Sequence, residues 1–251
     1  DKEGYMWVYH STEPNNRFIL FEFTLTRSGE NPKQHLKTYH GFLQTDGYSG
    51  YNAQREQVGI INVGCWDHAR RKFVDVVKGN GNNKSCKAVE MLKLISKLYE
   101  VEDEIRGKSV EERRERRQEK AKPILELMHA KLCNIHAPPQ SALGKAVYYA
   151  LNQWEYLSRY VEYGEVEISN CWAENQIRPL ALGRKNWLFV GNETSANKSA
   201  LLYSLIQSCK LNDINPRRYL IYVLNQVHRM RRKEIDPVTL LPQFIDKQLL
   251  A

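Results

Sequence analysis

The segment that decides the fold reads Ile168-Ser-Asn-Cys-Trp-Ala-Glu174-Asn-Gln-Ile-Arg178-Pro-Leu-Ala-Leu-Gly-Arg184-Lys185-Asn186-Trp187. It places one carboxylate, Glu174, on a predicted helix that is otherwise apolar and basic. A second isolated acid, Asp46, ends a short strand-like run and is followed by Gly47. Because glycine allows a sharp turn, we expect the Asp46 carboxylate to be exposed at the strand end.

The two acids predict a metal site that handles phosphate. Carboxylate oxygens are the ligands that Mg²⁺ and Mn²⁺ prefer. Two such ions held about 4 Å apart stabilise the attacking and leaving oxygens of an in-line displacement at phosphorus. Two simpler interpretations stay open from the residues alone: an i,i+4 ion pair between Glu174 and Arg178, and a surface turn acid at Asp46.

Basic residues surround both acids in the sequence. The candidates for contact with DNA phosphates are Arg178, Arg184, Lys185 and Asn186 after Glu174, and Arg70 and Arg71 in a predicted helix. Trp187 is suited either to stacking on an unpaired base or to packing in the core. For Arg70 and Arg71, solvation of a helix face is the alternative.

Cys65 and His68 stand three residues apart, as zinc ligands often do, but one Cys and one His make half a zinc site. Cys133 and His136 share that spacing, and nothing in the sequence pairs them with the first two. A zinc-stabilised structural module is therefore a weaker alternative.

Composition indicates a globular protein with an anionic partner. The 251 residues are 42% hydrophobic and 26% charged, with a formal net charge of +8. The five cysteines are scattered singly, which favours a reducing compartment, and the cytoplasm is the expected location. No apolar run is long enough to span a membrane, so no membrane partner is expected.

The sequence from 1 to 74 alternates strand and helix signals. Residues 4–10 and 17–24 predict a hairpin with a turn at 13–16. A helix is predicted from Pro32 through Tyr39, strands at 41–46 and 60–63, and a helix at 66–73.

Residues 75–165 are predicted to be helical, and Ser109 with Glu112 forms a capping box. The mixed charges of 111–120 predict a solvent-facing helix. In residues 166–251 we expect the Glu174 helix, a strand at 186–190, a helix at 194–210 and a further helix capped by Asn215. That last helix ends in a basic run that includes Arg229, Arg231, Arg232 and Lys233.

Three segments resemble bacterial transposases of the insertion-sequence sixty-six family. They are Asp46-Gly-Tyr-Ser-Gly-Tyr51, Val63-Gly-Cys65-Trp-Asp-His68-Ala-Arg-Arg-Lys-Phe73 and Ala173-Glu174-Asn-Gln-Ile-Arg178-Pro-Leu-Ala-Leu-Gly-Arg184-Lys-Asn-Trp187. Leu202-Tyr-Ser-Leu205 and Asn215-Pro-Arg-Arg-Tyr219-Leu fit the same pattern. The resemblance covers nearly the whole chain, and three long motifs in order are more specific than any one alone.

The resemblance implies an α/β fold with an RNase H-like catalytic core, here lacking its first strand. The core would comprise residues 1–74 and 166–251, interrupted by an all-helical insertion at 75–165 and extended by C-terminal helices. It implies an Asp-Asp-Glu triad in which Asp46 is the second acid and Glu174 the third, both binding Mg²⁺ or Mn²⁺. Cys65 and His68 resemble a motif between those acids and would support the site.

The resemblance also implies metal-dependent DNA cleavage and strand transfer. The partners would be element ends and target DNA, a homo-oligomer in a synaptic complex, and accessory transposition proteins. The family's first aspartate precedes Gly4, so we expect this chain to be an incomplete fragment, inactive alone. Ser169-Asn170-Cys171 stands where the family usually reads Asp-Asn-Asn. The alternative is a catalytically inactive DNA-binding remnant, with salt-sensitive but metal-independent binding.

Overall fold

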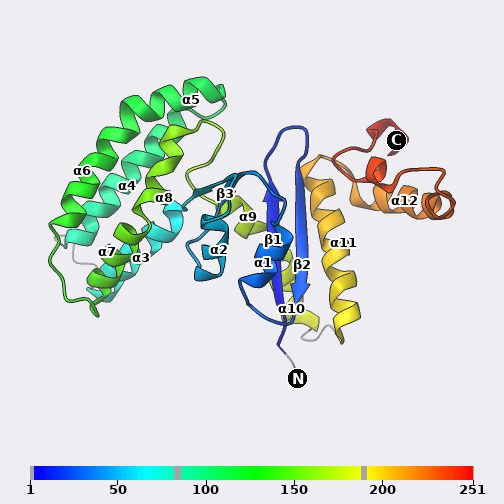
Figure 1. Ribbon diagram of the computed structural model, residues 1–251, viewed down its shortest axis with the longest axis horizontal. Helices are drawn as coiled ribbons and strands as arrows, with labels where there is room; N and C mark the ends of the chain where they lie inside the picture. Colours follow the sequence, from blue (N-terminus) through cyan, green and yellow to red (C-terminus); the bar gives the residue numbers. More distant parts are fainter. Residues whose placement is uncertain (1–2, 82–85, 188–190, 251) are drawn as a thin grey trace. The chain divides into compact units, whose positions relative to one another are not determined.

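The protein is described by a computed structural model covering residues 3–81, 86–187 and 191–250, without the side chains of residues 184–187 (Figure 1). The chain forms two compact units. Unit 1 contains Asp1–Arg27 and Cys171–Ala251, and unit 2 contains Ser28–Asn170. The fold is mixed α/β and mostly helical, and its described strands form two small sheets.

Unit 1 is built on the predicted hairpin, which is confirmed. Strands β1 (Tyr5–Ser11) and β2 (Phe18–Thr24) pair antiparallel, with Tyr5 opposite Thr24 and Ser11 opposite Phe18. Helix α11 (Glu193–Leu211) lies along β2 (Figure 1). Ile19 and Phe21 of β2 pack against Ala200 and Leu211 of α11, which buries one face of the hairpin.

Side chains of α11 and of its C-cap residue Asn212 also form hydrogen bonds with the outer edge of β2. The backbone N–H of Phe21 donates to Ser204 Oγ at 2.8 Å, and that of Ile19 donates to Ser208 Oγ at 2.9 Å. Asn212 Nδ2 donates to the carbonyl of Arg17 at 2.8 Å. These backbone groups on the edge of the hairpin are therefore satisfied by side chains instead of by another strand.

Two short helices, α9 (Cys171–Gln176) and α10 (Arg178–Trp187), follow the junction between the units. The prediction of a strand at 186–190 is wrong at its start, because α10 continues through Trp187. Residues 188–190 lie outside the described residues. Before position 186, α10 contains Leu180, Ala181, Leu182, Arg184 and Lys185, which all favour helix, and this local preference outweighs the strand-like aromatic residue.

The C-terminal part of unit 1 packs around helix α12 (Pro216–Arg231). Asn215 caps this helix as predicted, since its side chain accepts from Arg217 N at 3.0 Å. Two 3₁₀ helices, η4 (Pro237–Leu240) and η5 (Lys247–Leu250), complete the segment. Their core contains Cys209, Ile214, Tyr219, Leu240, Ile245 and Leu250.

The first part of unit 2 contains one short helix and a small parallel sheet. Helix α1 (Glu30–His35) is shorter than predicted and precedes β3 (Gly41–Gln44). The connection contains η1 (Ser49–Tyr51) and α2 (Asn52–Arg55) and leads to β4 (Ile60–Val63). The strands pair from Gly41 opposite Ile60 to Gln44 opposite Val63, so their carboxyl ends meet at one edge.

The rest of unit 2 is a helical bundle, as predicted (Figure 1). It contains α3 (Trp66–Gly79), α4 (Lys87–Glu104), α5 (Val110–Arg116), the π-helix η2 (Arg117–Ala121), α6 (Lys122–Cys133), α7 (Ala142–Asn152), α8 (Trp154–Ser158) and η3 (Arg159–Glu162). Ser109 and Glu112 form the predicted capping box of α5. None of the described helices is both long enough and apolar enough to cross a membrane.

One buried ion pair fixes the chain that leaves the bundle. Arg117 is fully buried, which contradicts the predicted solvent-facing helix at this position. Its guanidinium makes two bonds to Glu102, at 2.8 and 2.6 Å, and donates to the carbonyls of Tyr163 at 2.7 Å and Val166 at 3.0 Å. Residues 160–166 are thereby held against the helices.

The two units divide the chain by its internal contacts. The predicted domain ranges 1–74, 75–165 and 166–251 are instead drawn from the expected RNase H-like fold and its helical insertion. These domain ranges stay a prediction.

Candidate functional site

Asp46 lies just beyond β3, at the edge where both parallel strands end. The N–H of Thr45 donates to the carbonyl of Val63 at 3.1 Å, so strand pairing continues up to the residue before Asp46. Asp46 Oδ1 accepts from Tyr48 N at 2.9 Å, which makes a tight turn. Gly47 has φ +79, a backbone conformation that favours glycine. The carboxylate is thus held at the strand end, but it is half-buried and not exposed as predicted.

Helix α7 supports the Asp46 loop. Tyr149 donates its hydroxyl proton to the Asp46 carbonyl at 2.7 Å. Burial raises the pKa of Tyr149 above its usual range, and the Asp46 carboxylate adds to that effect, so the hydroxyl stays protonated and can donate. A Cβ on Gly47 would stand 3.0 Å from Gln153 Oε1 and 3.1 Å from the Tyr149 hydroxyl. The loop and the helix therefore fit closely.

Two cations that the sequence did not single out contact the α7 side chains that pack on this loop. Lys72 Nζ lies over the Tyr149 ring, 5.6 Å from its centroid. Arg55 donates to Gln153 Oε1 at 2.8 Å and lies over the Tyr156 ring at 4.3 Å. Both cations are linked to the Asp46 loop through α7, which lies about a hundred residues after Asp46 in the sequence. No local sequence pattern could therefore predict their place near the loop.

Cys65 and His68 follow β4 and therefore start from the same sheet edge as Asp46. Cys65 is buried, and burial raises its thiol pKa to about 11, so the sulfur remains a thiol at neutral pH. Within the described ranges, no three His, Cys, Asp or Glu residues are grouped to hold a metal ion, which leaves the zinc alternative without support.

Arg70 and Arg71 are both exposed on α3. Across the part of the chain that the structure describes, Arg70 forms no ion pair. Their accessibility suits contact with an anionic partner, and their role as DNA contacts stays a prediction.

Glu174 lies on α9 in unit 1 and is half-buried. On the same helix Trp172 stacks on His10 of β1, with ring centroids 5.9 Å apart. Arg178 is exposed at the start of α10, and among the described ion pairs none joins it to Glu174. The two residues lie on different helices, since α9 ends at Gln176 and α10 begins at Arg178.

The remaining predicted residues are placed only in part. Arg184, Lys185, Asn186 and Trp187 belong to α10, but their side chains lie outside the described part of the structure. Asp46 belongs to unit 2 and Glu174 to unit 1. The convergence of these two acids on shared metal ions stays a prediction.

Two family models match the chain. One described as "Transposase IS66 family" matches residues 1–198, and one described as "IS66 C-terminal element" matches residues 204–242. No solved structure matches.

Curated relatives are longer than this chain. Uncharacterized protein y4jD of Sinorhizobium fredii is 36% identical over 217 residues, which cover 83% of this chain and 42% of that protein. Uncharacterized protein y4hP of the same species is 37% identical over 216 residues, which cover 80% of this chain and 39% of that protein. The chain thus spans about two fifths of the length of these relatives.

Proposed function

Because the chain belongs to the IS66 family of transposases, we propose that it forms part of a catalytic region that cuts and joins DNA strands. The family matches confirm the resemblance of the three sequence motifs. The observation that carries the proposal is that one family model spans residues 1–198, which include both Asp46 and Glu174. The intact protein would nick DNA at the ends of an insertion sequence and join the freed 3′-hydroxyl to target DNA.

Asp46 and Glu174 are the proposed ligands of Mg²⁺ or Mn²⁺. A half-buried carboxylate on a braced loop at a strand end fits a hard cation, and Mg²⁺ usually takes one or two carboxylates, waters and substrate phosphates. The bound ions would stabilise charge on the attacking and leaving oxygens. Cys65 remains protonated and does not fit such an ion, so its proposed role, with His68, is to support the start of α3.

Cations near the acids would hold the DNA backbone. Lys72 and Arg55 lie around the Asp46 loop, and the exposed Arg70 and Arg71 belong to the same unit. In unit 1, Arg178, Arg184, Lys185 and Asn186 are proposed to contact phosphates beside Glu174. Lysine and arginine side chains neutralise phosphate charge and so fix the position of the strand that is cut.

The proposed fold of the catalytic region is an RNase H-like core. The order of a hairpin, a helix and two parallel strands ending in an acid supports it. The complete protein would act in the cytoplasm as a homo-oligomer that holds two element ends, with accessory proteins.

The test is strand transfer by the longer protein that contains this chain, assayed with labelled element ends and Mg²⁺. Asp46→Asn and Glu174→Gln each remove one carboxylate with little change in shape. Both are expected to abolish cleavage and joining while DNA binding persists. Asp75→Asn, at an exposed position on α3, is the matched control and should keep full activity.

Two outcomes would end the proposal. Joining activity that survives Asp46→Asn or Glu174→Gln would show that these acids are not the catalytic pair. A wild-type protein that binds duplex DNA without needing metal, and neither cuts nor joins, would instead be a DNA-binding remnant.

A further inference from the structure

Helix α12 has one face buried in unit 1 and one face open. Tyr219 is 2% exposed and donates its hydroxyl proton to the Leu240 carbonyl at 2.9 Å. Leu220, Tyr222, Val223 and Met230 pack against the same core. These contacts fix the rotation of the helix about its own axis, so the residues on the opposite face are permanently directed outward.

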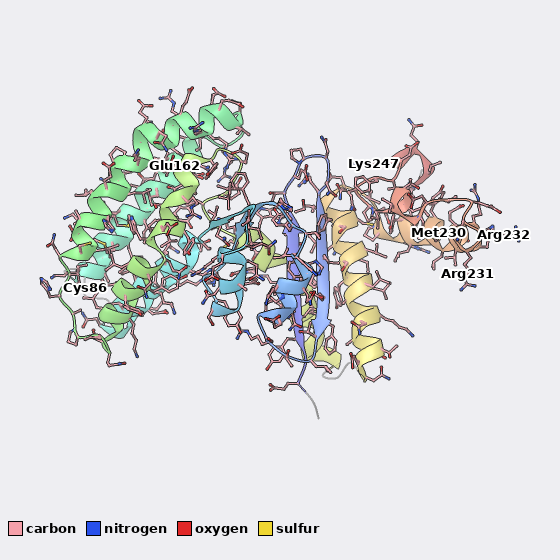
Figure 2. All side chains as sticks on the ribbon, viewed as in Figure 1. Cys86, Glu162, Met230, Arg231, Arg232 and Lys247 are labelled. Carbon is pink, nitrogen blue, oxygen red and sulfur yellow. The ribbon has the colours of Figure 1, made fainter. Side chains whose placement is uncertain are left out.

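The outward face is basic and carries no acid. Between Pro216 and Arg231 the helix contains four arginines, Arg217, Arg218, Arg229 and Arg231, with no Asp or Glu, and Arg232 follows at its end. All five arginines are exposed, and Figure 2 shows Arg231 and Arg232 at the end of α12. Among the described residues, Arg217, Arg218 and Arg231 form no ion pair.

Among the residues that the structure describes, one acid forms ion pairs with this group of cations. Glu234 is 3.6 Å from Arg229 and 3.8 Å from Arg232, and all three side chains are well exposed. Ion pairs of that kind contribute little, about 0–1 kcal/mol, so they leave both arginines able to exchange Glu234 for another anion.

The middle of the face is neutral. Ile221 is 53% exposed and Leu224 is 67% exposed, and the exposed Asn225 lies beside them. Large apolar side chains exposed on a basic helix, away from the core, indicate a surface that contacts a partner. The cations are therefore concentrated at the two ends of the helix, and the apolar and amide groups at its centre.

We propose that this face of α12 binds duplex DNA in the major groove. The sixteen residues of α12 extend about 24 Å, and Arg217 and Arg231 are separated by roughly 20 Å along the axis. The major groove is about 12 Å wide, so the terminal arginines reach the phosphates on either side. At the centre, Asn225 matches an adenine edge, and Ile221 and Leu224 match thymine methyl groups.

This inference rests on the proposed function, because it assigns the DNA of that reaction to a surface outside the catalytic acids. Charge complementarity selects the partner. A second copy of the chain would bring the same acid-free face, whereas a duplex brings two rows of phosphates at a spacing that the ends of α12 can reach.

The test is the salt dependence of duplex binding by the whole 251-residue chain, followed by fluorescence anisotropy in EDTA. The triple variant R217Q/R218Q/R231Q removes three phosphate contacts, and the slope of log Kd against log salt concentration should fall by about 2.7. The affinity gained between 200 and 50 mM salt should then shrink roughly 40-fold. I221A/L224A should weaken binding at every salt concentration without changing the slope.

The matched control is K198Q/K210Q/K247Q, which removes the same charge from exposed positions elsewhere in unit 1. It should keep the wild-type slope. An equal fall in slope in both triple variants would mean that only net charge matters and would overturn the inference. An unchanged slope in R217Q/R218Q/R231Q, with circular dichroism showing a folded protein, would overturn it as well.

Two further outcomes identify a different occupant and would also overturn it. If I221A/L224A dissociates an oligomer in sedimentation velocity and leaves duplex affinity intact, the face is a contact between copies. If vesicles containing phosphatidylserine bind as tightly as duplex at equal salt, the face is a lipid surface. Because binding is measured without metal, failure here leaves the chemistry of Asp46 and Glu174 untouched, and failure of strand transfer leaves this result standing.

Discussion

The hydroxyl of Tyr149 donates a 2.7 Å hydrogen bond to the backbone carbonyl of Asp46, joining positions 103 residues apart. The helical bundle therefore contributes directly to the position of the Asp46 loop. Through α7 it braces the loop that presents the proposed catalytic acid.

Tyr149→Phe removes the hydrogen bond to the Asp46 carbonyl and keeps the aromatic ring that Lys72 contacts. The lost bond should lower the free energy of unfolding by about 1 kcal/mol. In the longer protein, strand transfer should fall roughly 10- to 100-fold, as when groups that orient a metal ligand are removed. Urea unfolding and the joining assay check the two effects. Tyr148→Phe, at a neighbouring position that is 69% exposed, should change neither, and equal behaviour of the two variants would contradict the assigned role.

Gly47→Ala should destabilise the chain. A side chain at φ +79 is strained by about 1–2 kcal/mol, and its Cβ would stand 3.0 Å from Gln153 Oε1. Gly79→Ala is the control, because nothing lies within 4 Å of a Cβ there and alanine favours the end of α3. Thermal denaturation should show a lower Tm for the first variant and an equal or higher Tm for the second. A neutral Gly47→Ala would mean that the loop is not held as described.

Arg117→Met should be strongly destabilising. It leaves the Glu102 carboxylate half-enclosed without its partner and releases the Tyr163 and Val166 carbonyls, a loss of about 3–5 kcal/mol. Arg114→Met removes an exposed arginine from the preceding turn and should cost less than about 0.5 kcal/mol. Chemical unfolding of both variants is the measurement, and a small effect of Arg117→Met would show that the pair is replaceable.

The thiols should differ in reactivity at pH 8. Cys133 is exposed and should react rapidly with a disulfide reagent, whereas burial raises the pKa of Cys65 to about 11 and of Cys209 to about 12. Those two should react only on unfolding, when all five cysteines become accessible. Cys133→Ala should remove the fast phase. Rapid reaction of Cys65 in the folded protein would contradict its burial.

The raised pKa of the Cys65 thiol also makes the stability of the protein depend on pH. The unfolded thiol ionises near its ordinary pKa of about 8.5, whereas the folded Cys65 thiol stays neutral up to about pH 11. Its stabilising contribution is complete below the unfolded pKa and is lost as pH rises from about 9 to 11. The unfolding free energy of Cys65→Ala should fall less over that interval than that of the wild type, as urea titrations at successive pH values would show. Parallel curves would exclude this contribution.

Local signals in the sequence predicted the elements that depend on local chemistry. The hairpin follows from alternating aromatic and β-branched residues around a turn, and the caps at Ser109 and Asn215 follow from side chains that bond nearby N–H groups. The predicted solvent exposure of Arg117 is wrong, because mixed charges at helical spacing usually indicate a solvated face and here do not. Its burial depends on Glu102 in an earlier helix and on carbonyls more than 40 residues later.

In the candidate site, too, local sequence predicted some residues, and others depend on contacts between distant parts of the chain. Asp46 was found because a glycine follows it at the end of a strand, and both features are adjacent in sequence. Tyr149, Gln153 and Lys72 were missed because their relation to Asp46 exists only after the bundle has packed. The meeting of Asp46 with Glu174 depends on contacts of still longer range and stays a prediction.

The bonds from Ser204, Ser208 and Asn212 to β2 occupy backbone groups that an added strand would need, so these positions of the β2 edge are closed to further pairing. If two molecules met through their β1 strands, each would present only the β2 edge of its hairpin to a third molecule. Growth would then stop at a pair, because a fibril needs a free edge on both sides of every added layer. Three side chains of one helix thus limit how far this small sheet can propagate between molecules.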